Sequence, residues 1–247
     1  MAPVKKVKAE SYRVYLKQIE ALSKVANLIA SGMYLEELLR LIVQVTAEAM
    51  NSKISSLMVV DESKKELVIR ATQSVSEAYN KKPNIKIGEG IAGLVAAHNK
   101  IIVVLDLQAE PRYLNQDIAR KEGLVSLASV PLAIKGRVIG VLNSYTSKKH
   151  EFTRTELNIL SALATQAAMA IENAELALRA NSAEEALFTR KVVERAKEIL
   201  AQEANIAPQE AYRLIQKQSM DSRKSMRDIA EAIILTHDLK DNKARIK

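Results

Sequence analysis

The residues best suited to chemistry are three cations near the C-terminal end, Arg223, Lys224 and Arg227, in the stretch SMDSRKSMRDIAEAII. We expect a helix to begin after Asp221 or Ser222, since either residue is a good N-cap. The free N–H groups and the positive dipole end of such a helix favour an anion. The three cations therefore predict a phosphate-binding surface, although the same charges could simply fill a solvated helix face.

The neighbouring apolar residues define the other side of this expected helix. At 100° per residue around the helix, the three cations lie at the edge of the apolar face or opposite to it. We therefore expect the apolar core to tolerate their removal. The apolar face consists of Met226, Ile229, Ala230 and Ile233. An earlier helix, over 184–204, places Lys191 and Arg195 away from its own apolar face, but alone it reads as an ordinary exposed helix.

If the phosphates belonged to loop RNA, its bases would usually be held by stacking on aromatic rings or arginine planes. This part of the chain offers only Phe188 and Tyr212. Tyr212 shares a side with Ala211 and Ile215, so we expect it to be buried. Stacking would then fall to arginine, or hydrogen bonds to base edges would replace it.

Composition limits the possible functions. The 247 residues suit one large or two modest domains. The net charge is +8, but the first 13 and the last 9 residues each carry +3, which leaves +2 for the other 225. Bulk charge is thus weak evidence for nucleic-acid binding.

The absence of cysteine excludes disulfides, thiolate metal sites, thiol nucleophiles and thioether-linked cofactors.

Other catalytic and targeting signals are missing. His98, His150 and His237 stand in separate segments, and no P-loop or Ser/His/Asp grouping occurs, so we expect neither catalysis nor a metal site. The N-terminal stretch has no apolar signal core, and no run of about 18 apolar residues could span a membrane. We therefore expect a cytoplasmic protein with no membrane partner.

Hydrophobic periodicity predicts the elements of an N-terminal domain. They are helices over 12–29 and 34–50, a hairpin over 54–61 and 66–73, a Gly-rich turn and short helix over 87–100, a strand over 101–106, and a hairpin over 124–134 and 137–147. A long helix follows from Thr153. Its apolar residues step by three and four from Leu157 to Leu178, as in a coiled coil. With the similar spacing over 12–29, this favours a parallel homodimer, although the helix could instead pack on its own domain.

The residues after 184 predict three helices and no strand. The second begins at Pro208, a favoured first position, and extends to about Met220. Three short helices with matched apolar faces form a small bundle, too small for a deep pocket.

The stretches IGEGIAGLVAAHNKIIVVLD and SVPLAIKGRVIGVLNSYTSKKHEFTRTELNILSALATQAAMAIENAEL resemble a GAF domain. The resemblance implies a six-stranded antiparallel sheet with helices on one face and a small-molecule pocket on the other. Without cysteine the chain lacks the means for methionine sulfoxide reduction or bilin attachment. A pattern of some nucleotide-binding GAF domains is partly present, at Asn99, Lys100, Phe152 and Glu156. The last acidic residue of that pattern is replaced by Leu157. The cofactor or ligand stays unknown.

The stretch VVERAKEILAQEANIAPQEAYRLIQKQSMDSRKSMRDIAEAII resembles an ANTAR domain. The resemblance implies binding of paired RNA stem-loops in a nascent transcript, which prevents a transcription terminator from forming. The residues that we expect to bind RNA are Lys191, Arg195, Ser222, Arg223, Lys224 and Arg227.

The sequence thus predicts an α+β fold, in which a long helix joins a GAF domain to a three-helix ANTAR bundle. The expected parts are a basic tail (1–14), the GAF domain with its N-terminal and exit helices (15–180), the ANTAR domain (184–238) and a second basic tail (239–247). The predicted function is signal-responsive antitermination without enzymatic activity. The alternative is a GAF signalling module whose bundle binds a protein partner or DNA.

Overall fold

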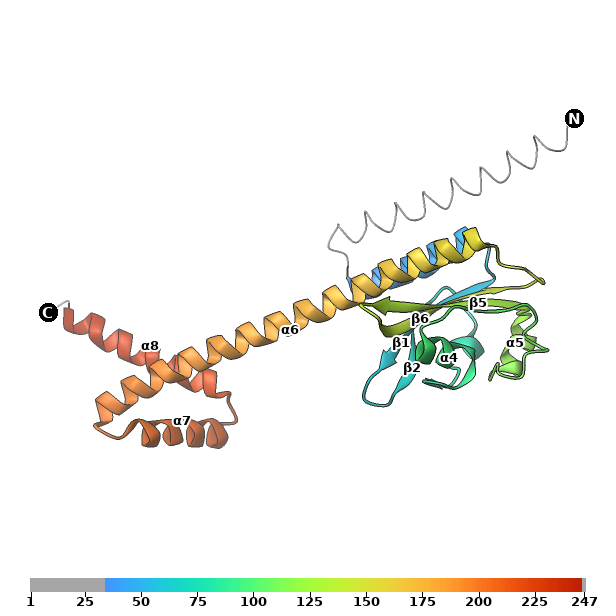
Figure 1. The fold of residues 1–247 in the computed structure, drawn as a ribbon. Helices are drawn as coiled ribbons and strands as arrows, with labels where there is room; N and C mark the ends of the chain where they lie inside the picture. The colour runs from blue at the N-terminus through green and yellow to red at the C-terminus, as the bar shows by residue number, and fades with distance from the viewer. Residues whose placement is uncertain (1–33, 246–247) are drawn as a thin grey trace, which may run out of the picture. The chain divides into compact units, whose positions relative to one another are not determined.

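The computed structural model describes residues 34–245, so the coiled-coil pattern predicted over 12–29 lies outside the described residues. The chain forms two compact units, one ending at Ala174 and the other beginning at Glu175. Figure 1 shows the helices and strands of both units, and each unit has its own hydrophobic core.

The first unit is built on one antiparallel sheet of six strands in the order β3-β2-β1-β6-β5-β4. Both predicted hairpins are present. The β5–β6 turn places Lys135 and Gly136 at φ of 50° and 83°, as a two-residue hairpin turn requires. The strands are β1 (Ile54–Asp61), β2 (Glu66–Thr72), β3 (Ile85–Lys86), β4 (Ile102–Val104), β5 (Ser126–Ile134) and β6 (Arg137–Thr146).

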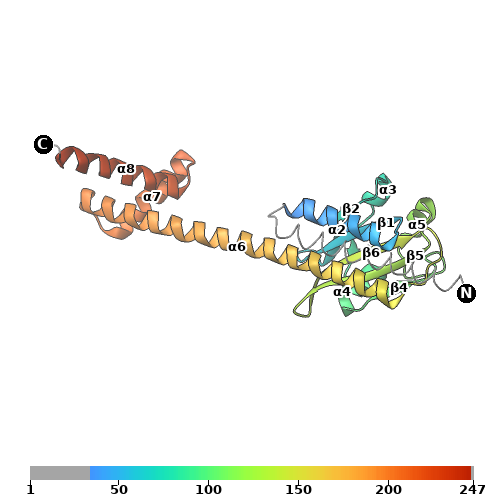
Figure 2. The same ribbon diagram turned by 90° about the horizontal axis from the view of Figure 1, so that it is seen from above.

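One face of the sheet is covered by α2 (Leu35–Met50) and the first part of α6 (Arg154–Ala204), which lie side by side (Figure 2). This use of α6 corrects the predicted dimer surface, because the residues from Leu160 to Ile171 pack inside the unit. The small alanines allow α6 to approach the sheet closely. The buried residues of the predicted interface are Leu160, Ala164, Ala167 and Ile171, and the neighbouring Leu163 and Ala170 are buried too.

The opposite face of the sheet carries α3 (Glu77–Asn80), α4 (Gly90–His98) and α5 (Gln116–Glu122). The sheet is therefore flanked by helices on both faces, and not on one as the family resemblance implied (Figure 1). Gly93 permits the close packing of α4, since a Cβ there would lie 2.3 Å from the carbonyl oxygen of Lys86. The α+β fold class is confirmed.

The second unit contains the end of α6, then α7 (Pro208–Ser222) and α8 (Met226–Arg245). Its core joins all three helices through Val193, Ala196, Ile215 and Ala230. The prediction of a separate helix starting near 184 is wrong, because α6 continues through 181–183 without interruption. Neither Gly nor Pro stands there to stop a helix.

The start of α8 also differs from the prediction. Arg223 takes a left-handed conformation with φ of 54° and ends α7. The Ser225 amide donates to Asp228 Oδ2 at 3.0 Å, and the Asp228 amide donates to Ser225 Oγ at 3.1 Å. Ser225, and not Asp221 or Ser222, is therefore the N-cap, because only Ser225 completes a reciprocal capping box. Arg223 and Lys224 lie in the α7–α8 turn and not in the helix.

Candidate nucleic-acid interface

The α7–α8 turn presents two cations on a fixed backbone. The Lys224 amide donates to the carbonyl of Ser219 at 3.2 Å, and Ser219 Oγ donates to the carbonyl of Lys224 at 2.6 Å. The side chains of Arg223 and Lys224 are exposed, and neither forms a hydrogen bond or ion pair with any residue in the described part of the chain. Both charges are thus available to an anionic partner without loss of an existing contact.

Arg227 has a different environment. Its guanidinium lies 4.7 Å from the centre of the Phe188 ring, and its nitrogens lie 2.8 Å from Glu231 and 3.7 Å from Glu185. Arg227 therefore links α8 to α6 and is partly neutralised. Arg227 lies outside the apolar core, which was expected to tolerate its removal, but its removal would cost these contacts between α8 and α6.

We expect Arg227→Ala to loosen the packing of α8 on α6. Loss of a cation–π contact at an exposed site predicts roughly two- to fivefold faster amide exchange in α7 and α8. Hydrogen exchange with mass spectrometry on the full chain measures this. Arg213→Ala, which removes an exposed arginine on α7, is the matched control, and equal exchange in both variants would contradict the structural role of Arg227.

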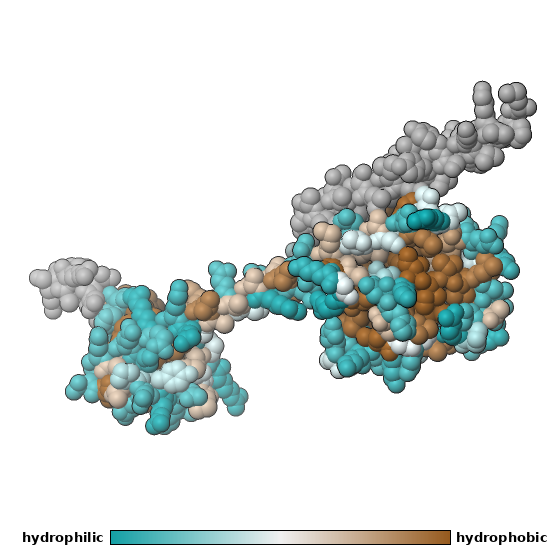
Figure 3. Space-filling view, in the orientation of Figure 1, coloured by the Kyte–Doolittle hydropathy of each residue, from teal (hydrophilic) through white to brown (hydrophobic). Residues whose placement is uncertain are grey.

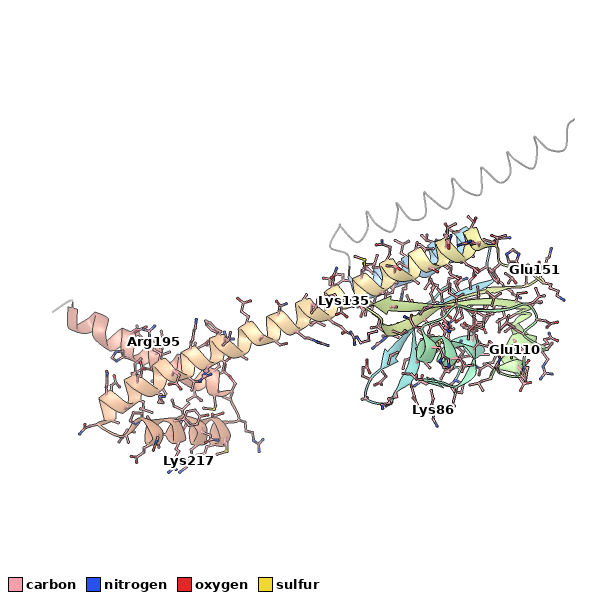
Figure 4. The ribbon with its side chains drawn as sticks, in the orientation of Figure 1. Lys86, Glu110, Lys135, Glu151, Arg195 and Lys217 are labelled. Atoms are coloured by element: carbon pink, nitrogen blue, oxygen red, sulfur yellow. The ribbon has the colours of Figure 1, made fainter. Side chains whose placement is uncertain are left out.

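The other predicted RNA-binding residues are distributed over separate elements. Lys191 is exposed on α6 and has no ion-pair partner among the described residues. Arg195, labelled in Figure 4, also lies on α6 and pairs with Asp238 of α8 at 3.3 Å. Ser222 Oγ donates to the carbonyl of Gln218 at 2.6 Å at the end of α7. Of the predicted set, Lys191, Arg223 and Lys224 are therefore uncommitted cations.

A shallow groove of about 710 Å³ lies within the second unit, and its lining includes Arg190 and Ser225, the sequence neighbours of Lys191 and Lys224. It contains Arg190, Tyr212 and Arg227, one residue from each helix. Tyr212 is 40% exposed, so its predicted burial is wrong. Ala211 and Ile215 point into the core and leave Tyr212 at the edge of the apolar face.

Sequence reasoning missed the groove as a site. Arg190 lies on the helix over 184–204 that alone reads as an ordinary exposed helix, and no sequence signal shows that α7 and α8 approach it. The aromatic count was the usable signal, because Phe188, at 48% exposure, and Tyr212 supply the aromatic surface of this unit's described part. Most of the surface visible in Figure 3 around this unit is hydrophilic.

Uncommitted cations beside exposed rings are suited to a nucleic acid with unstacked bases. Cations attract the phosphates, and aromatic rings stack on bases of any identity. Glu185 and Glu194 also line the groove and lower its affinity for a simple anion. The arrangement therefore favours phosphate contacts at the α7–α8 turn and base contacts in the groove.

The histidines have local partners or face solvent. His150 Nε2 lies 3.0 Å from Glu156, His237 Nδ1 lies 3.0 Å from Glu203, and His98 is exposed at the end of α4. Within residues 34–239, no group of three acidic or histidine side chains is arranged to hold a metal ion. None of the helices in the described part is both long and apolar enough to cross a bilayer.

The two units define a regulatory protein in which an α+β domain precedes a helical one. The chain belongs to the GAF family, whose domain model matches residues 33–172, and the ANTAR domain model matches residues 181–234. The order is that of a GAF–ANTAR regulator, and the chain is a signal-sensing regulator.

Similar proteins share the GAF fold in other contexts. A "Methyl sulfide methyltransferase-associated sensor" of Methanosarcina acetivorans is 28% identical over 160 residues, 63% of this chain and 16% of that protein. A "Phosphoenolpyruvate-dependent phosphotransferase system" protein of Escherichia coli is 24% identical over 63% of this chain and 21% of its own length. This chain thus spans about a fifth or less of these relatives.

Solved structures agree with this fold. The GAF domain of a phosphoenolpyruvate-protein phosphotransferase from Coxiella burnetii has a TM-score of 0.60 and 26% identity, covering 68% of this chain and 98% of that one. A free methionine-R-sulfoxide reductase from Neisseria meningitidis, solved with its substrate, has a TM-score of 0.57 and 26% identity, covering 65% of this chain and 91% of that one.

Proposed function

We propose that this chain is a cytoplasmic transcription antitermination regulator whose ANTAR domain binds paired stem-loops in nascent RNA under the control of its GAF domain. The observation that carries the proposal is the fixed α7–α8 turn, where the side chains of Arg223 and Lys224 are exposed and make no hydrogen bond or ion pair among the described residues. The adjacent groove adds Tyr212 for base stacking. In this proposal the functional parts keep the predicted bounds, 15–180 and 184–238, and neither part is catalytic.

A titration of the full chain tests RNA binding. We expect RNA with two stem-loops to bind more tightly than a single stem-loop, and duplex DNA of the same sequence to bind weakly. Affinity should fall with salt because cations release the counterions of the phosphates. Equal affinity for RNA and duplex DNA would favour the DNA-binding alternative, and binding to neither would favour a protein partner.

We also propose that the regulator is a homodimer, now through a different stripe of α6. Between residues 176 and 187 of α6, apolar residues recur at spacings of four, three and four along one side of the helix. They are Leu176, Ala180, Ala183 and Leu187, and the two leucines are 52% and 60% exposed. Exposed leucines at coiled-coil spacing favour a second copy of the same helix, and a dimer would present two ANTAR domains to two stem-loops.

Leu176→Asp is expected to convert the dimer to monomers at micromolar concentration, because each copy would place an unpaired carboxylate in the apolar contact. Sedimentation velocity measures the change. Asn181→Asp is the control, since it adds the same charge about 140° away around the helix. A wild-type chain that sediments as a monomer would contradict the dimer proposal.

A further inference from the structure

A small cavity lies in the first unit between the sheet and the start of α4. Its lining includes Lys82, Ile91, Tyr113, Leu127 and Tyr145. Its solvent-accessible volume is about 10 Å³, close to the space that one water molecule needs. The walls combine apolar side chains with a few polar groups, the usual composition of a small-molecule site.

Lys82 is the unusual member of this lining. The residue is only 7% exposed, although lysine is almost never buried without a partner. Its ammonium lies 4.1 Å from the centre of the Tyr79 ring and 5.9 Å from that of Tyr145. No carboxylate or other hydrogen-bond acceptor in the described part of the chain pairs with it. The fold thus packs the lysine side chain against aromatic rings, and its ammonium finds no acceptor among the described residues but is not fully shut off from solvent.

Tyr113 is a second polar residue of the lining, and its hydroxyl lacks a partner at normal hydrogen-bond geometry. The residue is 6% exposed, and its hydroxyl makes no hydrogen bond of normal geometry with the described residues. The neighbouring Tyr79 differs, because its hydroxyl lies 2.8 Å from Ser56 Oγ. A buried hydroxyl without a partner costs stability unless something else fills the position. The Tyr113 hydroxyl instead meets that of Tyr145, at a geometry short of a normal hydrogen bond. Lys82 and Tyr113 thus bring an ammonium without an acceptor and a weakly paired hydroxyl to one cavity.

The start of α4 contributes a third favourable group for an anion. Gly90, Ile91 and Ala92 line the cavity and form the first turn of this nine-residue helix. The preceding Glu89 makes no side-chain cap bond. The first N–H groups and the positive dipole end of the helix therefore add to the charge of Lys82.

The sheet beneath the cavity carries a buried polar row that holds Tyr79 in place. Ser129 Oγ donates to Asn143 Oδ1 at 2.7 Å, and Asn143 Nδ2 donates to Ser56 Oγ at 3.5 Å. Ser56 in turn meets the Tyr79 hydroxyl. Since a fully satisfied buried network is rigid, the ring beneath Lys82 is fixed in its orientation.

We propose that this cavity binds a small organic carboxylate, with Lys82, the Tyr113 hydroxyl and the first turn of α4 around its charged group. The apolar walls, which include Ile91 and Leu127, enclose a short hydrocarbon body. A single cation balances a single negative charge, which favours a carboxylate over a phosphate. The proposal rests on the sensing role in the proposed function and names the chemical class that the GAF domain senses.

Ligand entry requires movement of the segment 113–115, because the cavity holds no more than about one water molecule. Leu114 in this segment is 55% exposed, and a Cβ at Gly90 would lie 2.9 Å from its Cδ1. The segment therefore covers the start of α4, and a bound carboxylate would change its position.

Isothermal titration calorimetry of the full chain with propionate, propionamide and propylamine tests the proposal. We expect propionate to bind with a Kd of about 1 mM or tighter, and propionamide at least about tenfold more weakly. Lys82→Met should abolish propionate binding, and Tyr113→Phe should weaken it about three- to tenfold. Lys81→Met changes an exposed neighbour and should leave binding unaltered.

Several results would overturn the carboxylate site. These are equal binding of acid and amide, unchanged binding by Lys82→Met, binding of propylamine alone, and no binding of acetate, propionate or butyrate. The acid–amide comparison uses only wild-type protein, so it holds even if a variant misfolds. RNA affinity measured on the same preparation separates failure of this site from failure of the proposed function.

Discussion

Replacing Arg223 and Lys224 together with glutamine is expected to weaken binding of paired stem-loop RNA about 10- to 100-fold near physiological salt. Both side chains are exposed and make no hydrogen bond or ion pair among the described residues, so their removal costs only the weak attraction of Lys224 for Asp228 within the second unit. The slope of log affinity against log salt should fall by about 1.4–1.8 if each cation neutralises one phosphate. Filter binding or fluorescence anisotropy at several salt concentrations measures both quantities.

The matched control is Arg70→Gln with Lys86→Gln, which removes two exposed cations from the first unit. It changes the net charge of the chain equally, so it should reproduce any effect of bulk charge alone. The interface assignment would fail if the two double variants weakened RNA binding equally. A large loss of affinity with an unchanged salt slope would instead mean that the turn contacts bases and not phosphates.

The sequence was a good guide to the first unit because local rules and tertiary packing agree there. The apolar strands and the Lys135-Gly136 turn specify the β5–β6 hairpin, and α2 needs no more than its periodic leucines and valines. The role of α6 was harder to predict. A step of three and four residues serves packing on a sheet as well as packing in a coiled coil, and only the structure shows where Leu160 points.

The candidate site was predictable in composition and not in geometry. Asp221, Ser222 and Ser225 are all competent N-caps, and the choice among them depended on the Asp228 side chain three residues after Ser225. The contact between Arg227 and Phe188 joins residues far apart in sequence, so no helical-wheel argument finds it. Long-range packing, and not local propensity, decides which cations are free.

The buried Lys82 had no sequence signal at all. Lysine beside Pro83 in a polar connection reads as an exposed loop, since lysine is rarely buried. Its burial depends on the rings of Tyr79 and Tyr145, which come from α3 and from β6. Burial lowers the pKa of Lys82 to about 7, so its charge titrates near neutral pH.

Lys82 is therefore expected to make the stability of the first unit depend on pH. Between the folded pKa of about 7 and the ordinary lysine value of 10.5, the unfolded chain holds a proton that the folded chain lacks. Stability should rise with pH from about 7 to about 9, because folding releases that proton. Nearer to pH 10 the slope should reverse, because the phenols ionise in the unfolded chain and stay protonated in the folded one. Burial raises the pKa values of Tyr79, Tyr113 and Tyr145, so the phenols around Lys82 stay neutral meanwhile.

Lys82→Met should remove this pH dependence and stabilise the unit most at pH 7 and below. The full difference between the two pKa values corresponds to roughly 5 kcal/mol, and relaxation around the charge would reduce the gain to about 3–5 kcal/mol. Urea denaturation followed by near-ultraviolet circular dichroism reports on the first unit, because Tyr79, Tyr113 and Tyr145 are buried in it. Lys81→Met, the exposed neighbour, should leave the pH profile unchanged.

Two outcomes would contradict this view of Lys82. If Lys82→Met and wild type had parallel pH profiles, the ammonium would already be solvated or paired in solution. If Lys82→Met were less stable than wild type below pH 7, the contacts of the charged lysine would stabilise the folded state by more free energy than its burial costs. A bound carboxylate should act oppositely to burial, since a nearby negative charge raises a lysine pKa. Propionate should therefore flatten the wild-type profile and leave the Lys82→Met profile as it is.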